Sequence, residues 1–328
     1  MQRLILAIVL FVLAGPLAAQ DLKLPNKDGT TKFAVLGDTG TGGSDQVVVA
    51  RQLTSFRAKF PFEFALLLGD NLYGSERPGD YNRKFEGPYK ALLDAKVKFY
   101  AALGNHDDPN QRNYKLFNMN GERYYTFKPS LISNVRFFAL DSNYMDPTQL
   151  QWLEKELAGS GADWKIAFFH HPPYASGRHG SDEILRSHLE PLFVKYGVNV
   201  VLTGHEHFYE RIKPQKGVQY FVMGNSAKLR RGDIDPTGLT AVGYDEGYGF
   251  MLVEIDGDEM HFVTLNEQGK MVDSGVVRKA ANDNRVIGTT GKPGAGTETG
   301  PAKPAPAAPK PSAPQPPAAP KPSPQPQR

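Results

Sequence analysis

The chain has 328 residues, of which 40% are hydrophobic, a formal net charge of +3 and no cysteine. Without cysteine, disulfides and thiolate metal ligands are excluded, so any metal site has to use oxygen and imidazole ligands. The nearly balanced charge gives no reason to expect nucleic acid as a partner.

The first residues have the pattern of a secretory signal peptide. Arg3 supplies a positive charge, residues 4–13 are apolar, and Leu17, Ala18 and Ala19 form a small-residue cleavage site. We therefore predict a signal peptide over residues 1–19 and a chain exported to the periplasm or secreted. An uncleaved anchor is the alternative. No later segment approaches the ~20 apolar residues of a membrane span, so no integral membrane segment is expected after signal cleavage.

Five apolar segments are each followed by residues of types that bind metals. The segments are residues 32–36, 64–68, 98–103, 165–169 and 199–203, and the residues that follow them include Asp38, Asp70, Asn105, His170, His205 and His207. Such runs without alternation are typical of buried parallel strands, whose carboxyl ends present functional groups at one edge of the sheet. Glycines at four of these ends predict turns with positive φ that let the ends converge on one point.

Other segments predict helices. One begins near Ser44 or Asp45, either of which can serve as N-cap, and a short one covers residues 85–93. Asp146 caps a third, and residues 181–196 form a fourth. The side chains expected to face the core are Leu150, Leu153 and Leu157 in the third helix and Ile184, Leu185, Leu189, Leu192 and Phe193 in the fourth.

Strands dominate the later part of the sequence. Residues 123–127 and 135–140 predict a pair of strands, and further strands are expected over residues 218–223, 249–255, 259–265 and 270–277. Helices and strands alternate first and strands follow, so two mixed sheets fit better than one doubly wound sheet. We predict an α/β fold over residues 20–284, a four-layer α-β-β-α sandwich of two mixed sheets flanked by helices.

The composition changes near residue 284. Half of the 26 prolines lie beyond Gly291, among alanine, lysine, glutamine and serine. Such a segment buries too little apolar surface to offset its ordering entropy, so residues 285–328 predict a disordered, polyproline-like tail. A spacer and a recognition segment are both open interpretations, and the sequence names no partner for the tail.

The strand-end motifs together resemble a known family. Gly37-Asp38-Thr39-Gly40, Gly69-Asp70-Asn71-Leu72-Tyr73, Gly104-Asn105-His106-Asp107, His170-His171-Pro172 and Gly204-His205-Glu206-His207 are similar to the motifs of the calcineurin-like metallophosphoesterases. Most members have Asp-x-His in the first motif, but position 40 here is glycine. In this respect the chain resembles the purple, tartrate-resistant type of acid phosphatase, which uses a tyrosine instead, here Tyr73. The resemblance covers nearly all of residues 30–265.

Phosphate ester hydrolysis is often performed by two metal ions that share a carboxylate, and Asp70 is the candidate for that role. The resemblance implies that Asp38, Tyr73 and His207 complete a ferric site. It implies that Asn105, His170 and His205 complete a site for divalent iron, zinc or manganese. Hard oxygen ligands suit a trivalent ion, and imidazole with a neutral amide suits a divalent one.

Two uncertainties concern the histidine motifs. We expect His205 and His207 both to be ligands only if the backbone turns at this strand end. The family pattern favours His170 over His171, and Glu206 is interpreted as structural.

Three further residues are expected to act on the substrate. His106 follows a predicted ligand, and Asp107 beside it is expected to fix its tautomer. The resemblance implies that His179 also lies near the phosphate; a solvated loop histidine is the alternative. One or both histidines would protonate the leaving group. Arg178, Arg230 and Arg231 are candidate phosphate contacts, and residues 227–246 a candidate specificity loop.

The function predicted from these residues is an exported dinuclear-metal phosphatase, acting on small phosphomonoesters by attack of a metal-activated water with histidine as acid. A phosphodiesterase or nucleotidase on the same scaffold is the alternative. A noncatalytic envelope-associated module, attached through the proline-rich tail, is a remote one.

Overall fold

The computed structural model describes residues 22–130, 133–161, 163–235, 237–279 and 286–287. The predicted signal peptide and all but two residues of the predicted tail lie outside these ranges. Among the described residues, none of the helices combines the length and the apolar character needed to cross a membrane.

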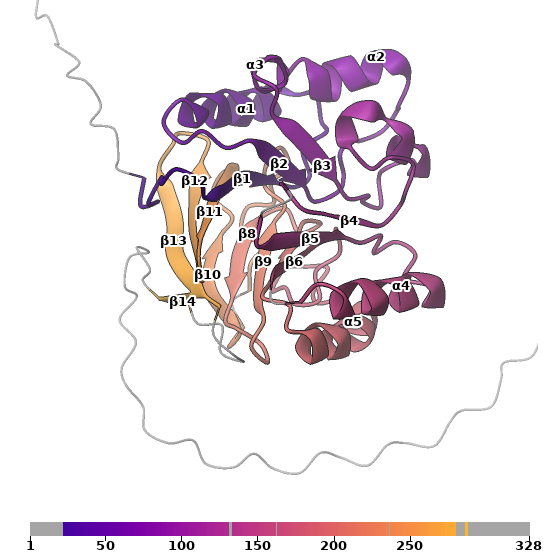
Figure 1. Cartoon of the computed structure of the whole chain (residues 1–328). Coiled ribbons are helices and arrows are strands. Elements are labelled where there is room, and N and C mark those ends of the chain that lie inside the picture. The colour runs from indigo at the N-terminus through magenta and orange to yellow at the C-terminus, as the bar shows by residue number, and fades with distance from the viewer. Residues whose placement is uncertain (1–21, 131–132, 162, 236, 280–285, 288–328) are drawn as a thin grey trace, which may run out of the picture. The chain divides into compact units, whose positions relative to one another are not determined.

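Fourteen described strands form two mixed sheets of seven strands each (Figure 1). The first has the order β14-β13-β12-β11-β1-β2-β3 and the second the order β10-β8-β9-β7-β6-β5-β4. The strands are β1 (Thr31–Leu36), β2 (Phe64–Leu67), β3 (Lys98–Ala101), β4 (Tyr125–Phe127), β5 (Val135–Ala139), β6 (Trp164–Phe168), β7 (Val200–Thr203), β8 (Tyr209–Ile212), β9 (Gln219–Met223), β10 (Thr240–Tyr244), β11 (Gly249–Asp256), β12 (Glu259–Asn266), β13 (Met271–Arg278) and β14 (Val286–Ile287).

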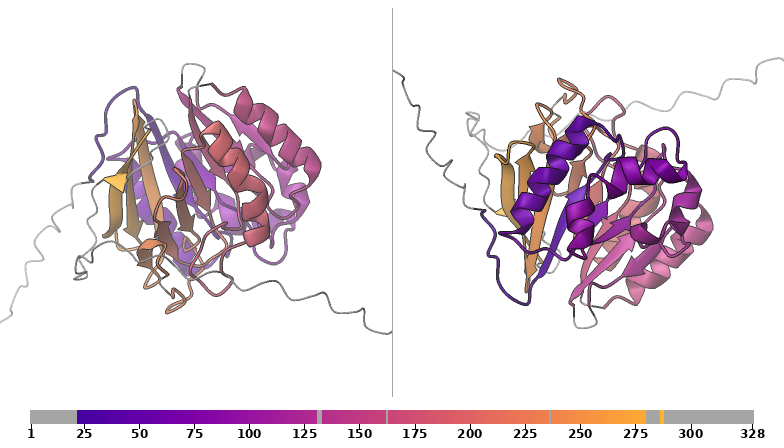
Figure 2. Two further views of the ribbon diagram at one scale, coloured as in Figure 1. Left: turned by 90° about the horizontal axis from the view of Figure 1, so that it is seen from below. Right: turned by 90° about the horizontal axis from the view of Figure 1, so that it is seen from above.

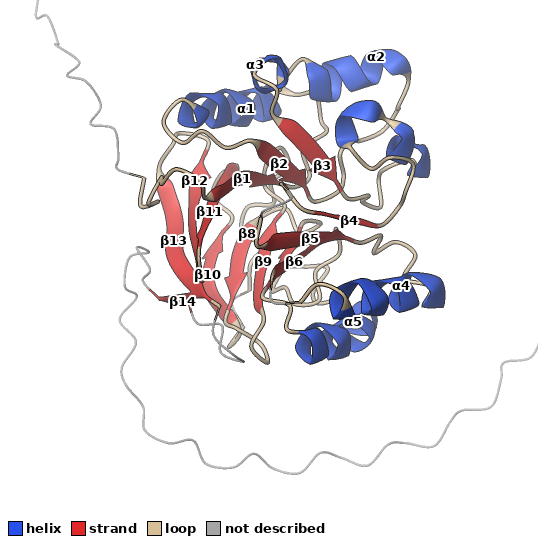
Figure 3. Ribbon diagram, viewed as in Figure 1, coloured by secondary structure: helices blue, strands red, loops and turns tan. Residues whose placement is uncertain are grey.

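Helices cover the outer faces of the two sheets, as Figure 3 shows in blue and red. On the first sheet lie α1 (Ser44–Arg57), α2 (Pro78–Tyr81), the π-helical turn η1 (Asn82–Glu86), α3 (Lys90–Asp94) and the 3₁₀ turns η2 (Pro109–Asn113) and η3 (Lys115–Phe117). On the second sheet lie α4 (Pro147–Ala158) and α5 (Glu183–Tyr196). The predicted two mixed sheets with flanking helices are confirmed.

Three separate apolar layers stabilise this arrangement, which the two views of Figure 2 show from opposite sides. One fills the space between the first helices and the first sheet, a second lies between the sheets, and a third lies between the second sheet and α4 and α5. In β1, Ala34 and Leu36 face the first layer while Phe33 and Val35 face the second. Both faces of the strand are therefore buried, which explains why its sequence shows no alternation.

The topology brings the functional ends together. β1, β2 and β3 run parallel in the first sheet, and β5, β6, β7 and β9 run parallel in the second. Carboxyl ends of parallel strands meet at one edge, so the residues after β1, β2 and β3 come to lie opposite those after β6 and β7.

Several local predictions needed correction. The N-cap of α1 is Gly43, without a side-chain bond, instead of Ser44 or Asp45. The single helix predicted over residues 85–93 is instead η1 followed by α3. Ile184 does not face the core, because 74% of its surface is exposed; it lies in the first turn of α5, where only one face packs on the sheet.

Three strands were not predicted, β8, β10 and β14. β10 lies within the predicted specificity loop and pairs with β8 at the edge of the second sheet. The cap predicted at Asp146 is present, since its carboxylate accepts a bond of 2.9 Å from the Gln149 amide. β14 lies beyond residue 284 and pairs with β13.

Candidate metal centre

The backbone adopts an unusual conformation at three of the predicted ligands. Asp38, Asp70 and His205 have φ values of +58°, +51° and +70°, a left-handed conformation that L-residues other than glycine seldom adopt. Such a conformation costs on the order of 1–3 kcal/mol and persists where the surroundings impose it. It turns the chain directly after β1, β2 and β7, which satisfies the condition for His205 and His207 to approach one site together.

The glycines beside these residues have a different role from the one predicted. Of the four that precede predicted ligands, only Gly69 has a positive φ, at +91°. A side chain on Gly104 would lie 2.2 Å from Asp70 Oδ1, and one on Gly204 would lie 2.6 Å from Asp38 Oδ2. Gly104 and Gly204 are required for close approach, and after Gly37, Gly69 and Gly204 the residue that follows takes the left-handed conformation.

One group of ligand-type atoms comprises Asp38, Tyr73 and His207. The Tyr73 hydroxyl donates to Asp38 Oδ1 at 2.9 Å and lies 3.3 Å from His207 Nε2. His207 Nε2 in turn lies 3.3 Å from Asp38 Oδ1. Asp38 is fully buried, so a carboxylate, a phenol and an imidazole meet in a place that water does not reach freely.

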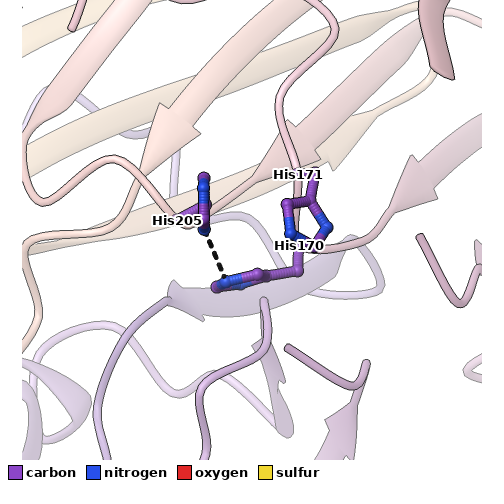
Figure 4. Close-up of side chains that lie close together, drawn as sticks. All are labelled: His170, His171 and His205. Atoms are coloured by element: carbon purple, nitrogen blue, oxygen red, sulfur yellow. Dashed lines mark hydrogen bonds between the residues drawn. The ribbon is translucent and has the colours of Figure 1, made fainter. Parts of the chain in front are cut away.

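The second group comprises Asn105, His170 and His205. Asn105 Oδ1 lies 3.0 Å from His170 Nε2 and 3.0 Å from His205 Nδ1. The two imidazole nitrogens are 3.1 Å apart, along the dashed line in Figure 4. His170 Nδ1 lies 2.9 Å from the Leu68 carbonyl, which can only accept, so His170 Nε2 is left with a lone pair directed at the other two atoms.

Asp70 lies between the two groups. Its Oδ1 is 3.4 Å from His170 Nε2, and its carboxylate also falls with Asp38 and His207 in a group whose ligand atoms lie within 4.8 Å of one another. The His106 amide donates to the same Oδ1 at 3.0 Å, which fixes the orientation of the carboxylate.

The geometry of both groups fits a metal ion. Ligands about 2.1 Å from a cation and at right angles are roughly 3 Å apart, the separation found in each group. In the second group an amide oxygen and two imidazole nitrogens face one another with too few protons to share, which is unfavourable unless a cation lies between them. All seven side chains offer oxygen or imidazole nitrogen, the donors left to a chain without cysteine.

The protonation states agree with this interpretation. Burial lowers the pKa of His205 to about 2 and that of His207 to about 3, and holds the pKa of His170 well below its usual value. The imidazoles are therefore neutral, with lone pairs available to a metal. Burial and the neighbouring Asp70 hold the pKa of Asp38 well above its usual value, an effect that a bound cation would reverse.

Asp107 does not contact the His106 ring in the part of the chain that the structure describes. Its carboxylate instead accepts bonds from the amides of Asn71, Leu72 and Gly104 and from the side chains of Asn71 and Gln111, at 2.8 to 3.1 Å. It joins the loop after β2 to the loop after β3, and we correct its predicted role from fixing a tautomer to positioning these loops. The His106 ring lies against Tyr73, with centroids 4.9 Å apart.

Glu206 organises the loop that contains His179. One carboxylate oxygen accepts from the amides of His179 and Gly180 at 2.8 and 2.9 Å, and the other lies 3.4 Å from His179 Nδ1. Arg230 donates to His179 Nδ1 at 3.2 Å, and the His179 ring lies 4.5 Å from that of His205. His179 is thus held against the centre by two partners, which a free solvated loop histidine would lack.

Two more residues at the centre were not predicted as site residues. Lys228 places its ammonium 4.5 Å from the centre of the Tyr73 ring, and His171 lies with its ring 4.5 Å from that of His205. Lys228 lies in the predicted specificity loop, residues 227–246, but nothing in the sequence singled it out from that loop. Of the predicted arginines, Arg230 lies at the centre, whereas Arg231 donates to the Glu246 carbonyl. Burial lowers the pKa of His179, and the charges of Arg230 and of the exposed Arg178 lower it further.

Comparison with known proteins agrees with the fold and identifies the family. The family model of the calcineurin-like phosphoesterases matches residues 31–209. The chain therefore belongs to this family, and it is a metal-dependent phosphoric ester hydrolase.

Within the family, its relatives are purple acid phosphatases. It is 26% identical to purple acid phosphatase 7 of Arabidopsis thaliana over 80% of this chain and 92% of the relative. It is 25% identical to tartrate-resistant acid phosphatase type 5 of Homo sapiens over 77% of this chain and 94% of the relative. A purple acid phosphatase from yellow lupin seeds has the same fold, with a TM-score of 0.64 at 16% identity, over 78% of this chain and 55% of that one.

Proposed function

We propose that this protein is a dinuclear-metal phosphatase that hydrolyses phosphomonoesters. The observation that supports this most strongly is the pair of ligand-type groups, each with contacts of about 3 Å, on either side of Asp70. Two bound cations would supply an acidified water and neutralise the phosphoryl oxygens.

The two groups differ in their ligands, and this supports an assignment of metals. Asp38, Tyr73 and His207 with Asp70 would hold ferric iron, because two carboxylates and a phenolate favour a hard trivalent ion. Asn105, His170 and His205 with Asp70 would hold a divalent iron, zinc or manganese ion.

Four side chains around the centre suit the remaining tasks. Lys228 and Arg230 bring positive charge to the position of the phosphate, and guanidinium groups form strong bonds with phosphate oxygens. His106 and His179 lie on either side of the centre, against Tyr73 and His205 respectively. Either can donate a hydrogen bond to the oxygen of the leaving alcohol, and we propose His179 as the main donor to that oxygen, since Arg230 binds its Nδ1 and leaves the Nε2 hydrogen available.

The signal-like residues 1–19 support export to the periplasm or the medium.

The test is a comparison of p-nitrophenyl phosphate with its bis ester, combined with metal analysis and a visible spectrum of the purified chain. We expect about two metal ions per chain, including iron, a violet tyrosinate band, and much faster turnover of the monoester. Preferential turnover of the diester would replace the proposal with a phosphodiesterase. A fully active, colourless zinc enzyme would overturn the ferric assignment alone.

A further inference from the structure

A cavity of about 470 Å³ opens beside the candidate metal centre. It begins at Asn105 and His171, which border the second group of ligands, and extends to Ser142, Asn143, Tyr144 and Asp182. A volume of this size is in the range of small-molecule sites and exceeds what a phosphate alone requires. The cavity is therefore the place for the organic part of a substrate whose phosphate lies at the centre.

The polar groups of the cavity suit hydroxyl groups. Ser142 binds both the amide and Nδ1 of His171, at 3.0 and 2.8 Å, so Nε2 is the nitrogen of this ring left for a ligand. Asn143 is fixed by its bonds to Asp141 and to the carbonyls of Leu103 and Gly104. Fixed acceptors and donors of this kind recognise a sugar by its hydroxyl groups.

The charge of the cavity excludes many phosphorylated substrates. Asp182 lines it together with Asp107, which already accepts five hydrogen bonds, and Asp141, which is paired with Arg123; no lysine or arginine lines it among the described residues. Further phosphates on the organic part would meet like charge, which costs binding free energy. A substrate with a single phosphate and a neutral organic part is therefore favoured over a polyphosphate.

Tyr144 also lines the cavity and offers it a planar ring. It borders a second cavity as well, together with Pro109, Arg123, Met145 and Asp146. The guanidinium of Arg123 lies 5.7 Å from the centre of the Tyr144 ring and is itself fixed by Asp141 and Asp146. Even so, 59% of the surface of Tyr144 is exposed. Among the described residues four large hydrophobic side chains are exposed, and Tyr144 is the aromatic one. An exposed but supported ring is suited to stack on a second flat ring.

We propose that the substrate is a nucleoside monophosphate, with its sugar in the cavity beside Asn105 and His171 and its base stacked on Tyr144. This rests on the proposed phosphatase function for the position of the phosphate. The three features fit in order along one molecule: phosphate at the centre, hydroxyl groups in the polar cavity, and a flat ring at Tyr144.

Binding of adenosine tests the cavity without any need for turnover. Calorimetry on the full chain should detect adenosine, and Tyr144→Ala should weaken its binding by about tenfold, the loss typical of one stacked base. Tyr144→Phe should retain binding because it keeps the ring, and Val194→Ala, which trims a side chain that is 44% exposed on α5, is the matched surface control. Equal binding by wild type and Tyr144→Ala, or no binding by wild type, would overturn the proposal.

Turnover provides the second test. AMP should have a kcat/KM about tenfold above that of ATP, because of the negative charge of Asp182 in the cavity. Tyr144→Ala should reduce the AMP rate by about tenfold more than the rate of glycerol 1-phosphate. Asp182→Asn keeps a residue that can cap α5. It should narrow the difference in kcat/KM between AMP and ATP. Equal effects on AMP and glycerol phosphate would overturn the nucleoside assignment and leave the phosphatase function intact. Adenosine binding by a chain that hydrolyses no phosphate ester would instead support the cavity and refute the phosphatase function.

Discussion

The two halves of the candidate metal centre are built from the same edge of the fold but from different chemistry. In one half, Asp38 and Tyr73 add anionic or potentially anionic oxygen to a single imidazole. In the other, Asn105 adds a neutral oxygen to two imidazoles. Asp70 lies against both. The difference supports the proposed assignment of a trivalent ion to the first half and of a divalent, more readily exchanged ion to the second.

The largest expected effect comes from removing what the halves share. Asp70→Ala should lose both metals and reduce kcat by about a thousandfold or more, since metal catalysis contributes several kcal/mol to transition-state stabilisation. Metal content per chain and the rate with p-nitrophenyl phosphate measure this. Asp94→Asn, an exposed acid on α3 paired with Lys90, is the control. Retention of two metals by Asp70→Ala would show that the halves do not depend on a shared carboxylate.

Treatment with a chelator should distinguish the two halves by the order in which they lose their metals. Mild treatment is expected to remove the ion from the Asn105 half first, because its ligands carry no charge apart from Asp70, and activity should fall close to zero with one metal still bound. Zinc or manganese should restore it, as measured by metal analysis alongside activity. Loss of both metals in parallel would contradict the difference between the halves.

Tyr73→Phe tests the other half alone. We expect the violet band to disappear, since the phenolate is its source, while the divalent half still binds its ion. The rate should fall by about 10 to 100-fold, a loss comparable to that caused by changing a residue that tunes a metal. The visible spectrum and the zinc or manganese content provide the measurement. An unchanged spectrum would show that Tyr73 is not a ligand.

Asp107→Ala should slightly weaken both halves of the metal centre, because Asp107 joins the loops that carry their ligands. Loss of the acceptor for several buried donors is expected to destabilise the fold by about 1–3 kcal/mol, seen as a lower midpoint in urea. The metals should still bind when the protein is saturated with them. A normal midpoint would contradict the role of Asp107 in joining the loops after β2 and β3.

The smallest effect is expected at Asp146, far from either half. Its bond to the Gln149 amide, and after that its pairing with Arg123, hold its pKa below the usual value. Because the folded pKa is lowered, the contribution to stability is present above the unfolded pKa of about 4 and is lost as the pH falls through the folded value. The thermal midpoint of Asp146→Ala should therefore lie below that of wild type at pH 7, and the two should approach each other below pH 4. A constant difference down to pH 2 would exclude this titration as the cause.

Much of the centre was accessible from the sequence because its ligands follow long apolar runs. Asp38 and Asp70 could be located from the strands before them, since buried parallel strands lack alternation and end at a common edge. The left-handed conformations of Asp38, Asp70 and His205 could not be predicted from the sequence, because the packing of neighbouring strand ends imposes them. The pairing of β10 with β8, and the contacts of Glu206 and Lys228, join segments far apart in the chain and leave no periodic signal. Ile184 was misplaced because an apolar residue in the first turn of a helix satisfies the pattern whether or not anything covers it.

Each half of the centre takes side chains from both sheets: Asp38, Tyr73 and Asn105 follow strands of the first, and His170, His205 and His207 follow strands of the second. Elsewhere the two sheets pack on each other through an apolar layer that includes Phe, Leu and Val side chains. Bound ions would therefore crosslink the two sheets at this one edge. Removal of the metals should accelerate amide hydrogen exchange around β1, β2 and β7. Exchange at the opposite edge of the sheets should change little.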